Sequence, residues 1–429
     1  MDSDAKNGWS SRTLYELAEY QNGQAFRPAD TRGTGLPIIK IAELNEGIGP
    51  STGRASCEID SRKIIRAGDL LFAWSGSVGV YKWGGPAAAL NQHIFKVTSR
   101  NGVDQTFLRY LLENQLQTFQ RVVEDQATTM GHVKIADLRR LRAEVPPLPE
   151  QLSIARVLGS LDDKIELNRR MNQTLEEICR ALFKFWFVDF GPVRAKAEGR
   201  WKKGESLPGM PADMWDLWPS DFEKSEIGEI PKGWRVEPVS SVVEVNPERR
   251  LHRGQAVPYV EMGQLPTSST RVMDWVVRPF ASGSRFHNGD VLVARITPCL
   301  ENGKTAYVDF LEEEGTGWGS TEFLVIRSRS PIPPQWSYLL ARTEGFRSHL
   351  IQNMSGTSGR QRAPAECLNS FPVAVPPEDI ASRFGRTVAP WFEAMKAHDE
   401  ESRTLSSIRD AFLPKLLSGE LRVRWSETQ

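Results

Sequence analysis

Two polar segments of the chain combine small hydroxyl residues, glycine and cations. The first, residues 127–134, reads Ala-Thr-Thr-Met-Gly-His-Val-Lys, and the second, residues 355–362, reads Ser-Gly-Thr-Ser-Gly-Arg-Gln-Arg. Glycine and small hydroxyl residues let backbone amides approach phosphates, whereas arginine and glutamine can each pair with a base through two hydrogen bonds. Both segments are therefore candidates for DNA contact. The alternative is that each is a polar loop that caps the next element of structure.

The charge around these segments supports contact with DNA. Residues 345–365 carry a net +3 and residues 121–142 a net +2, although the whole chain is neutral, with 54 basic and 54 acidic residues. A neutral chain by itself argues mildly against a nucleic-acid-binding protein, because such domains are often basic. Ordinary solvated loops would carry the same local charge, so the alternative stays open.

Further polar residues lie close to predicted strand ends in both halves of the chain. Trp74-Ser75-Gly76-Ser77 and Arg295-Ile296-Thr297 each follow a strand that begins Gly-Asp, and a turn at residues 302–304 is close by. Asn91-Gln92-His93 is the remaining polar cluster in the first half. The candidate contacts with double-stranded DNA in the first half are Trp74, Ser75, Ser77, Asn91, Gln92, Thr129, His132 and Lys134. Those in the second half are Arg295, Thr297, Asn302, Lys304, Thr357, Ser358, Arg360, Gln361 and Arg362.

Patterns that would support catalysis are incomplete. Asn246-Pro247-Glu248-Arg249 lacks the second proline and the aromatic residue of an amino-methyltransferase motif. Gly303-Lys304 resembles the end of a phosphate loop, but the glycine needed five positions earlier is Pro298. The six histidines are far apart in sequence, without a metal-binding pair. We therefore expect a chain without catalytic residues, bound metal or cofactor.

Length and composition favour a soluble protein of several domains. A chain of 429 residues exceeds one ordinary domain. No apolar run is long enough to span a bilayer, and the N-terminus lacks the basic-then-apolar order of a signal peptide. The four cysteines are scattered, as reduced cytoplasmic thiols are. We expect a cytoplasmic location and no membrane partner.

The chain contains an internal repeat, because segments of one kind recur in one order. Gly8-Trp9-Ser10 returns as Gly233-Trp234-Arg235, a shift of 225 (234 − 9); Gly68-Asp69-Leu70-Leu71 returns as Gly289-Asp290-Val291-Leu292, a shift of 221 (289 − 68); Val145-Pro146-Pro147 returns as Val375-Pro376-Pro377, a shift of 230 (375 − 145). A duplicated unit predicts a pseudo-twofold molecule suited to a two-part target.

Each copy opens with short alternating segments typical of strands and continues with a helix. The strands expected in the first copy are residues 37–44, 69–74, 79–83 and 93–97, and in the second copy residues 258–262, 290–295, 305–310 and 322–327. The helices expected are residues 105–120 and 334–352. Mixed units of about 150 residues have the size of one α+β domain.

A long helix follows each Val-Pro-Pro. The first is expected from Glu150 to about Phe187, and the second from about Glu378 to Leu413, where Pro414 ends it. The expected apolar seam of the first is Ile154, Leu158, Leu161, Ile165, Leu175, Ile178 and Leu182, and that of the second is Val388, Trp391, Met395, Leu405, Ile408 and Phe412. Neither helix can bury such a seam alone, so we expect the two to pair as an antiparallel coiled coil.

Polar residues interrupt both seams near the middle. Antiparallel pairing would bring Asn168 and Asn172 near His398 and Ser402. We expect a buried polar layer that fixes the register of the two helices at some cost in stability. The alternative is that these four residues face solvent.

Two aromatic-rich segments flank the start of the second copy. Residues 191–224 contain Trp201, Trp215, Trp218 and Phe222, too many aromatics for a free linker, so this segment should be ordered against the second domain. The run from Phe183 to Phe190 should also pack against that domain; the alternative is a docking face for another subunit.

The chain resembles the specificity subunit of type I restriction–modification systems over nearly its whole length. The resemblance depends on four segments in order: Pro146-Pro147-Leu148-Pro149-Glu150-Gln151, Phe185-Trp186-Phe187-Val188-Asp189-Phe190-Gly191-Pro192-Val193, Ser225-Glu226-Ile227-Gly228-Glu229-Ile230-Pro231-Lys232-Gly233-Trp234, and Lys415-Leu416-Leu417-Ser418-Gly419-Glu420-Leu421. Each segment alone is weak evidence, but four in this order within a duplicated chain are strong.

The resemblance implies an α+β fold of two pseudo-twofold-related α/β target-recognition domains joined by two long helices in an antiparallel coiled coil. The expected boundaries are 1–149 and 225–377 for the recognition domains, 150–190 and 378–429 for the helices with the C-terminal tail, and 191–224 for an ordered linker. The function implied is non-catalytic recognition of a bipartite, asymmetric DNA site. Two modification subunits, using S-adenosylmethionine, and restriction/translocase subunits, using ATP and magnesium, are the implied partners. A symmetric coiled-coil scaffold with two protein-binding domains is the alternative.

Overall fold

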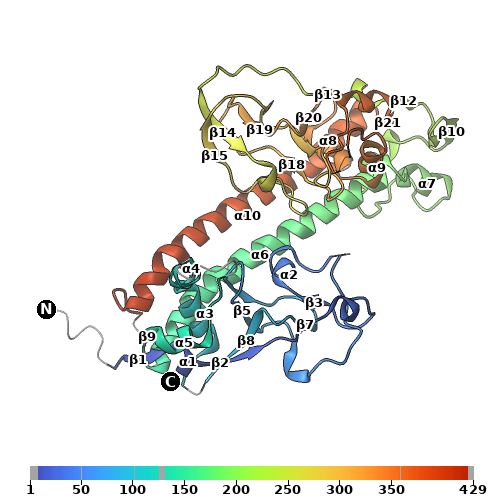
Figure 1. The fold of residues 1–429 in the computed structure, drawn as a ribbon. Helices are drawn as coiled ribbons and strands as arrows, with labels where there is room; N and C mark the ends of the chain where they lie inside the picture. Colours follow the sequence, from blue (N-terminus) through green and yellow to red (C-terminus); the bar gives the residue numbers. More distant parts are fainter. Residues whose placement is uncertain (1–7, 50, 101, 125–130, 358, 424–429) are drawn as a thin grey trace. The chain divides into compact units, whose positions relative to one another are not determined.

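The computed structural model describes residues 8–49, 51–100, 102–124, 131–357 and 359–423. The chain divides into two compact units, one of Met1–Ile165 with Arg403–Gln429 and the other of Glu166–Ser402. Each unit contains one globular domain and a segment of each of two long helices (Figure 1). Among the described residues, no helix is both long and apolar enough to cross a membrane.

The first domain is built on three small sheets and a few short helices. Its strands are β1 (Ser10–Thr13), β2 (Ala18–Asn22), β3 (Ile38–Ile39), β4 (Ile64–Ile65), β5 (Leu70–Ala73), β6 (Gly79–Lys82), β7 (Ala88–Leu90), β8 (Ile94–Ser99) and β9 (Arg142–Val145). Its helices are α1 (Leu14–Leu17), α2 (Ile41–Glu46), α3 (Gln105–Asn114), α4 (Leu116–Glu124) and α5 (Ile135–Arg140), with 3-10 turns at Pro28–Thr31 and Ser61–Lys63. The sheets have the strand orders β1-β9, β2-β8-β5-β6 and β3-β7-β4.

The second domain repeats this arrangement with additions. Its strands are β10 (Phe222–Ser225), β11 (Gly228–Pro231), β12 (Arg235–Pro238), β13 (Val243–Val245), β14 (Ala256–Val260), β15 (Val276–Pro279), β16 (Ser284–Phe286), β17 (Val291–Ala294), β18 (Thr305–Tyr307), β19 (Gly317–Gly319), β20 (Phe323–Ser328) and β21 (Pro372–Val375). Its helices are α8 (Pro334–Ala341) and α9 (Glu344–Gln352), with 3-10 turns at Ala212–Leu217, Val239–Ser241, Met262–Gln264 and Ala365–Ser370. The sheets have the orders β10-β11, β12-β21, β13-β20-β17-β18 and β15-β14-β19-β16.

The strand orders confirm the internal repeat. The sheet β2-β8-β5-β6 corresponds strand by strand to β13-β20-β17-β18. In the first sheet Ala73 lies opposite Ile94, and in the second Ala294 lies opposite Phe323. Likewise β3 pairs in parallel with β7 as β14 does with β19. The second copy adds β15 at the edge of this sheet and the β10–β11 hairpin before it.

The expected strands and helices are found, although β14 ends at Val260 instead of residue 262 and β18 at Tyr307 instead of residue 310. Three larger corrections concern one strand and two helices. The strand expected over residues 37–44 ends after Ile39, because Glu43 accepts a hydrogen bond from the backbone of Lys40 and so caps helix α2. The helix expected over residues 105–120 breaks at Gln115 into α3 and α4. The helix expected over residues 334–352 breaks in the same way, because Thr343 caps the start of α9.

The repeated Gly-Asp motif has a structural role in both domains. Gly68 and Gly289 have positive φ angles of 95° and 86°, a conformation that glycine adopts without strain. The aspartate that follows accepts a backbone hydrogen bond from three residues earlier, at 2.8 Å for Asp69 and 2.7 Å for Asp290. Each also pairs with a cation of the neighbouring strand, Asp69 with Lys96 and Asp290 with Arg327. The motif therefore fixes the turn that starts the central strand.

The two long helices are α6 (Leu148–Phe187) and α10 (Glu378–Ser418), and they pack together in antiparallel fashion (Figure 1). In the second unit Asn172 meets Asp399 and Asn168 meets Ser402, so that residue numbers run in opposite directions. In the first unit Asp162 pairs with Arg409 and Glu150 with Arg422, in the same antiparallel order. The expected pairing is thus confirmed within each unit.

Parts of the expected seam are wrong. Ile178 is 44% exposed and its neighbour Cys179 is buried instead, because the second domain covers that side of α6. Ile408 and Phe412 are also exposed, at 38% and 39%. Pro414 does not end α10, which continues to Ser418. Leu416 and Leu417 of this last turn are buried in the core of the first unit, and that burial offsets the hydrogen bond lost at the proline.

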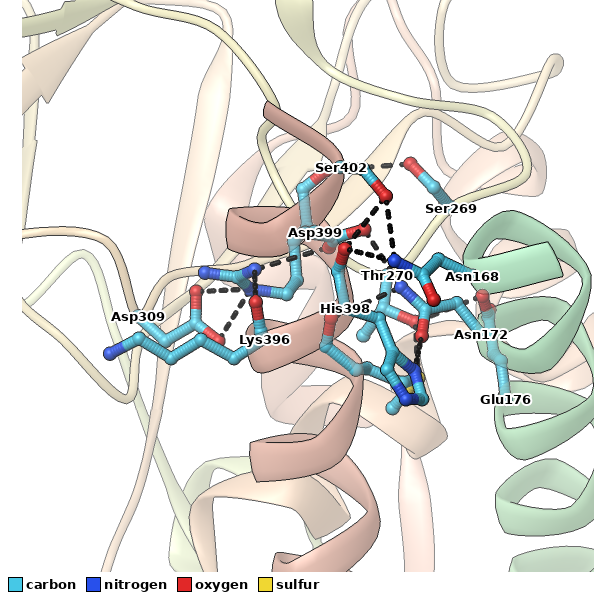
Figure 2. Close-up of polar contacts among 12 residues, drawn as sticks. Asn168, Asn172, Glu176, Ser269, Thr270, Asp309, Lys396, His398, Asp399 and Ser402 are labelled. Carbon is cyan, nitrogen blue, oxygen red and sulfur yellow. Dashed lines mark hydrogen bonds and ion pairs between the residues drawn. The ribbon is translucent and has the colours of Figure 1, made fainter. Parts of the chain in front are cut away.

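The predicted polar layer is present between the helices of the second unit (Figure 2). The side-chain nitrogen of Asn168, a fully buried residue, lies 2.8 Å from a carboxylate oxygen of Glu401 and 3.2 Å from the hydroxyl of Ser402. Asn172 donates to Asp399 at 2.7 Å, and its oxygen lies 2.8 Å from Nδ1 of His398. The four residues expected there therefore face each other rather than solvent.

A buried tyrosine joins each globular domain to the helices of its unit. In the first unit the Tyr110 hydroxyl donates to Asp162 at 2.7 Å, and Asp162 also binds Arg109 and Arg409. In the second unit Tyr338 donates to Glu176 at 2.8 Å. Burial raises the pKa of both tyrosines, so each stays a protonated donor.

A second set of contacts attaches the second domain to the helices next to the polar layer. Thr270 donates to Glu176 of α6 at 3.0 Å. Arg271, which is 5% exposed, pairs with Asp309 of its own domain and with Asp399 of α10. Burial raises the pKa of Asp309 and of Asp399, although Arg271 opposes the shift in each. Asp399 thus takes part both in the polar layer that fixes the register of the helices and in the contact that attaches this domain to them.

The segment between the two copies belongs to the core of the second unit. It contains α7 (Gly191–Ala197) and buries Trp201, Met214 and Trp218. Trp186, at the end of α6, is fully buried against Trp218 and Phe384, with ring centroids 5.5 and 5.4 Å away. The aromatic run at the end of α6 is therefore core packing, as expected.

Candidate nucleic-acid interface

Three chain segments meet at one end of the central sheet in the first domain. Trp74 follows β5, and His93 immediately precedes β8, the strand that pairs with it. The Trp74 amide donates to the His93 carbonyl at 3.3 Å, and the Val133 amide donates to the Trp74 carbonyl at 2.9 Å. A β-bridge joins Ser75 to His132. The candidate segments at 74–77, 91–93 and 131–134 are therefore adjacent.

The second domain brings together the corresponding segments. Arg295 follows β17, and Glu322 immediately precedes β20. The Arg295 amide donates to the Glu322 carbonyl at 3.0 Å, and the Ala363 amide donates to the Arg295 carbonyl at 2.9 Å. A β-bridge joins Ile296 to Arg362. The candidate segments at 295–297 and 360–362 are therefore also adjacent.

These two places are equivalent by position in the repeat. Ser75 and Ile296 differ by 221 residues (296 − 75), and His132 and Arg362 by 230 (362 − 132). Those are the shifts that relate the Gly-Asp and Val-Pro-Pro motifs of the two copies. Hydrogen bonds of one pattern hold the three segments in both domains, so the same surface point carries Trp74, His93 and His132 in one and Arg295, Glu322 and Arg362 in the other.

The side chains at the point in the first domain are aromatic. The Trp74 ring centroid lies 5.6 Å from that of His93 and 5.5 Å from that of His132. The Trp74 nitrogen donates to Asn22 at 3.1 Å, which fixes the indole. Nδ1 of His93 and Nδ1 of His132 are buried without a hydrogen-bond partner among the described residues. The cluster therefore offers ring faces and imidazole nitrogens but no ion pair.

The side chains at the point in the second domain are charged. Arg362 makes a two-point ion pair with Glu322, with Nε 2.8 Å from one carboxylate oxygen and 2.9 Å from the other. Nε of Arg295 lies 3.8 Å from the same carboxylate. The hydrogen bond to Glu322 raises the pKa of Arg362 above its usual value. Two guanidinium groups thus share one carboxylate, and a net charge of +1 remains.

The other candidates fall into three groups. Ser75 and Asn91 are buried, and Asn91 accepts from the His93 amide at 3.2 Å, so these two support the loops. Lys304 donates to the Met262 carbonyl at 2.8 Å, and Thr297 lies beside Met354. The exposed candidates are Ser77, Gln92, Lys134, Asn302, Thr357 and Arg360, with Gln361 partly exposed. Thr129 and Ser358 lie outside the described residues.

Glu322 was absent from the candidates expected from the sequence, whereas its counterpart His93 lies in the expected polar cluster at residues 91–93. Glu322 precedes a strand, and the polar residues expected in the second copy follow Gly-Asp strands or lie on nearby loops. The antiparallel register places Glu322 beside Arg295, the residue that follows the neighbouring strand. The equivalent position of His93 beside Trp74 in the first copy is the signal that points to it.

The described residues contain no group of three or more histidine, cysteine or acidic side chains placed to hold a metal ion. Outside the points above, Nε of Arg249 and Nε of Arg285 are buried without a hydrogen-bond partner among the described residues. Both residues line a hollow of about 230 Å³, together with Asn246 and Glu248.

Known proteins resemble the chain over most of its length. Residues 6–177 match the family described as the type I restriction modification DNA specificity domain. The MjaIX specificity subunit of Methanocaldococcus jannaschii is 24% identical over 85% of this chain and 80% of its own. The HindI specificity subunit of Haemophilus influenzae is 26% identical over 73% of this chain and 76% of its own.

A solved structure has the same fold. The type I restriction-modification S subunit from M. genitalium is 15% identical, covers 95% of this chain and 96% of its own, and has a TM-score of 0.51. The duplicated domains and paired helices are therefore those of this fold. Residues 6–177 thus match the type I restriction modification DNA specificity domain, and over most of its length the chain is similar to the specificity subunits of type I restriction enzymes.

Proposed function

We propose that this subunit recognises a bipartite, asymmetric DNA site, with one half contacted by each globular domain. The observation that carries the proposal is the pair of equivalent surface points. Both domains present side chains at the same place in the fold, but with an aromatic cluster in one and a charged cluster in the other. Base edges are distinguished by the donors and acceptors offered to them, so unlike clusters at one position favour unlike half-sites.

The long helices set the unread distance between the half-sites in this proposal. A helix of about 40 residues is about 60 Å long, and a paired helix resists bending more than a loop does. The buried contacts of Asn168 and Asn172 with α10 support a single register. One register gives one spacing, which a recognition sequence with a fixed gap requires.

The partners proposed are double-stranded DNA, two modification subunits, and restriction/translocase subunits, acting in the cytoplasm. The chemistry then belongs to those partners: S-adenosylmethionine is used by the modification subunits, and ATP and magnesium by the others. The role of this chain is to bind and orient. Lys134, Arg360 and Gln361, which lie on the loops beside the two surface points, are proposed to contact the DNA.

The test is selection from a randomised duplex pool by the full chain in complex with its modification subunits. We expect enrichment of two unlike half-sites at a constant spacing. A pool that returns no sequence, or one that returns two identical halves, would contradict the proposal. A gel shift with the unselected pool at several salt concentrations measures the sequence-independent part of binding.

Two substitutions separate phosphate contacts from base contacts. Lys134→Ala should weaken binding to all duplexes and reduce the slope of log affinity against log salt by about 1. Gln361→Ala should relax one base position of one half-site and leave that slope unchanged. If both variants bind as the wild type does, these loops do not contact DNA.

A further inference from the structure

The Arg295–Glu322–Arg362 cluster has a geometry that goes beyond general affinity for DNA. Glu322 is largely covered, with 21% of its side chain exposed, whereas 42% of the Arg362 side chain is exposed. The partly covered carboxylate therefore holds an arginine whose side chain is more exposed. A carboxylate in this place reduces attraction to phosphate, so its presence needs another reason.

The hydrogen bonds of Arg362 show what remains for a ligand. A guanidinium has five N–H donors in a fixed plane. Arg362 uses Nε and Nη2 toward Glu322, with the Nη2 nitrogen 2.7 Å from the carboxylate, and Nη1 lies 3.3 Å from the Arg360 carbonyl. Two donors are left, one on Nη1 and one on Nη2, at the end of the side chain. In a planar guanidinium the protons of Nη1 and Nη2 at the end of the side chain are nearly parallel, and the pairing with Glu322 restrains rotation of that plane.

Among base pairs in the major groove, G·C and C·G present the matching acceptors. Guanine offers O6 and N7 as two adjacent acceptors, and arginine pairs with both. Adenine and thymine each offer one acceptor, beside an amino or a methyl group. Two parallel donors in a fixed plane therefore favour guanine, and a fixed plane loses less freedom on binding than a mobile side chain.

We propose that Arg362 reads one guanine in the half-site of the second domain, and that Glu322 is the positioning residue that makes this reading selective. The proposal rests on the proposed function, since it assumes that this domain contacts DNA. Arg295, 3.8 Å from the same carboxylate, balances the charge of Glu322 and keeps the cluster attractive to DNA. The equivalent point of the first domain has no such fork, so its half-site is read by different chemistry.

The experiment is the same duplex selection, performed with the wild type and four variants in the complex with modification subunits. Arg362→Lys keeps the charge but loses the planar fork, so the preference for guanine at one position should fall about tenfold to a hundredfold. Glu322→Gln keeps the size of the side chain but removes its charge. It should lower the same preference while raising affinity for unselected duplex, because one negative charge near the DNA is gone.

The third variant is a matched control. Arg278 pairs with Glu261 at 2.8 Å in the same domain, and both are about half exposed. Arg278→Lys makes the same chemical change outside the cluster and should leave every selected position as in the wild type. His93→Gln, at the position equivalent to Glu322, should alter only the half-site of the first domain.

In Glu322→Gln the preference for guanine should fall while the affinity for unselected duplex rises, and these opposite changes identify the positioning role of Glu322. A loss of folding would lower selectivity and affinity together, and the melting temperature measured in parallel would show it. If Arg362→Lys weakens binding to all duplexes alike and leaves the base preference intact, Arg362 contacts phosphate and the proposal is overturned. If the wild type itself selects no sequence, the proposed function fails first.

Discussion

Replacing Asn168 by leucine should stabilise the second unit, and the structure allows the size of the effect to be worked out. Asn168 is fully buried, and its side-chain oxygen is buried without a hydrogen-bond partner among the described residues. Its nitrogen has three acceptors within 3.2 Å but only two protons to give. The substitution thus removes about two hydrogen bonds, each with a net contribution of about 1 kcal/mol.

The favourable changes are larger. An unsatisfied buried oxygen costs about 1–3 kcal/mol, and burying a leucine side chain contributes about 2 kcal/mol. The acceptors left behind are not stranded: Ser402 still donates to the His398 carbonyl at 2.7 Å, and Glu401 is exposed to water. With about 2 kcal/mol subtracted for the two lost hydrogen bonds and about 1 kcal/mol for the larger side chain, the net gain is about 1 kcal/mol.

The assay is thermal unfolding of the full chain, followed by circular dichroism. For a unit of this size each kcal/mol corresponds to roughly 2–4 °C, so the transition of the second unit should rise by about 2–4 °C. Asn172→Leu is the matched control one turn further along α6. Both ends of Asn172 are bonded, to Asp399 at 2.7 Å and to His398 at 2.8 Å. Its removal takes the side-chain partner from Nδ1 of His398 and, among the described residues, leaves Asp399 with Arg271 alone, so it should lower the transition.

Two results would refute this reasoning. If Asn168→Leu lowers the melting temperature, the polar layer stabilises the fold, and the unpaired Asn168 oxygen costs less than assumed here. If both variants shift the transition in the same direction, the balance of bonded and unbonded atoms does not decide their effect. Asn168→Asp, which places a carboxylate against that of Glu401, should be the least stable of the series.

Three further predictions concern the buried contacts of each unit. Asp162→Asn should destabilise the first unit by about 2 kcal/mol near neutral pH, because Arg109 and Arg409 lose a shared partner. Burial raises the pKa of Asp162, but the hydrogen bonds from Tyr110 and Arg409 and the charges of the two arginines outweigh it and lower that pKa overall. The ionised Asp162 side chain therefore stabilises the fold above its unfolded pKa of about 4, and this stabilisation is lost as the pH falls through its lower folded pKa. The free energies of unfolding of wild type and variant should then converge in acid. A constant difference down to about pH 2 would contradict this. Trp186→Ala should lower the free energy of unfolding of the second unit by about 3–5 kcal/mol, because the ring is fully buried. An unchanged melting temperature together with lost binding of modification subunits would instead identify Trp186 as a docking residue. Leu416→Ala should destabilise the first unit by about 2–4 kcal/mol if the helix beyond Pro414 is part of its core, and no change in unfolding would show that this turn is dispensable.

The sequence by itself determined the large features of this protein. The internal repeat can be recognised in the sequence because equivalent turns need the same residues. Both copies have a glycine at a positive φ angle, followed by an aspartate that accepts a hydrogen bond from the backbone of the turn. The spacing of apolar residues and the lack of helix-breaking residues in their first turns predict the long helices. The polar layer followed from their antiparallel pairing, since asparagines at the middle of one seam must meet the middle of the other.

Only the tertiary structure decided which faces are covered and which side chains meet. Ile178 and Cys179 are both apolar neighbours on one helix, and the second domain, rather than helix periodicity, buries the cysteine. A proline such as Pro414 usually ends a helix, but α10 continues to Ser418 because Leu416 and Leu417 of its last turn are buried. The Arg362–Glu322 pair joins residues 40 apart through the register of two strands, and register depends on the whole sheet rather than on any local pattern.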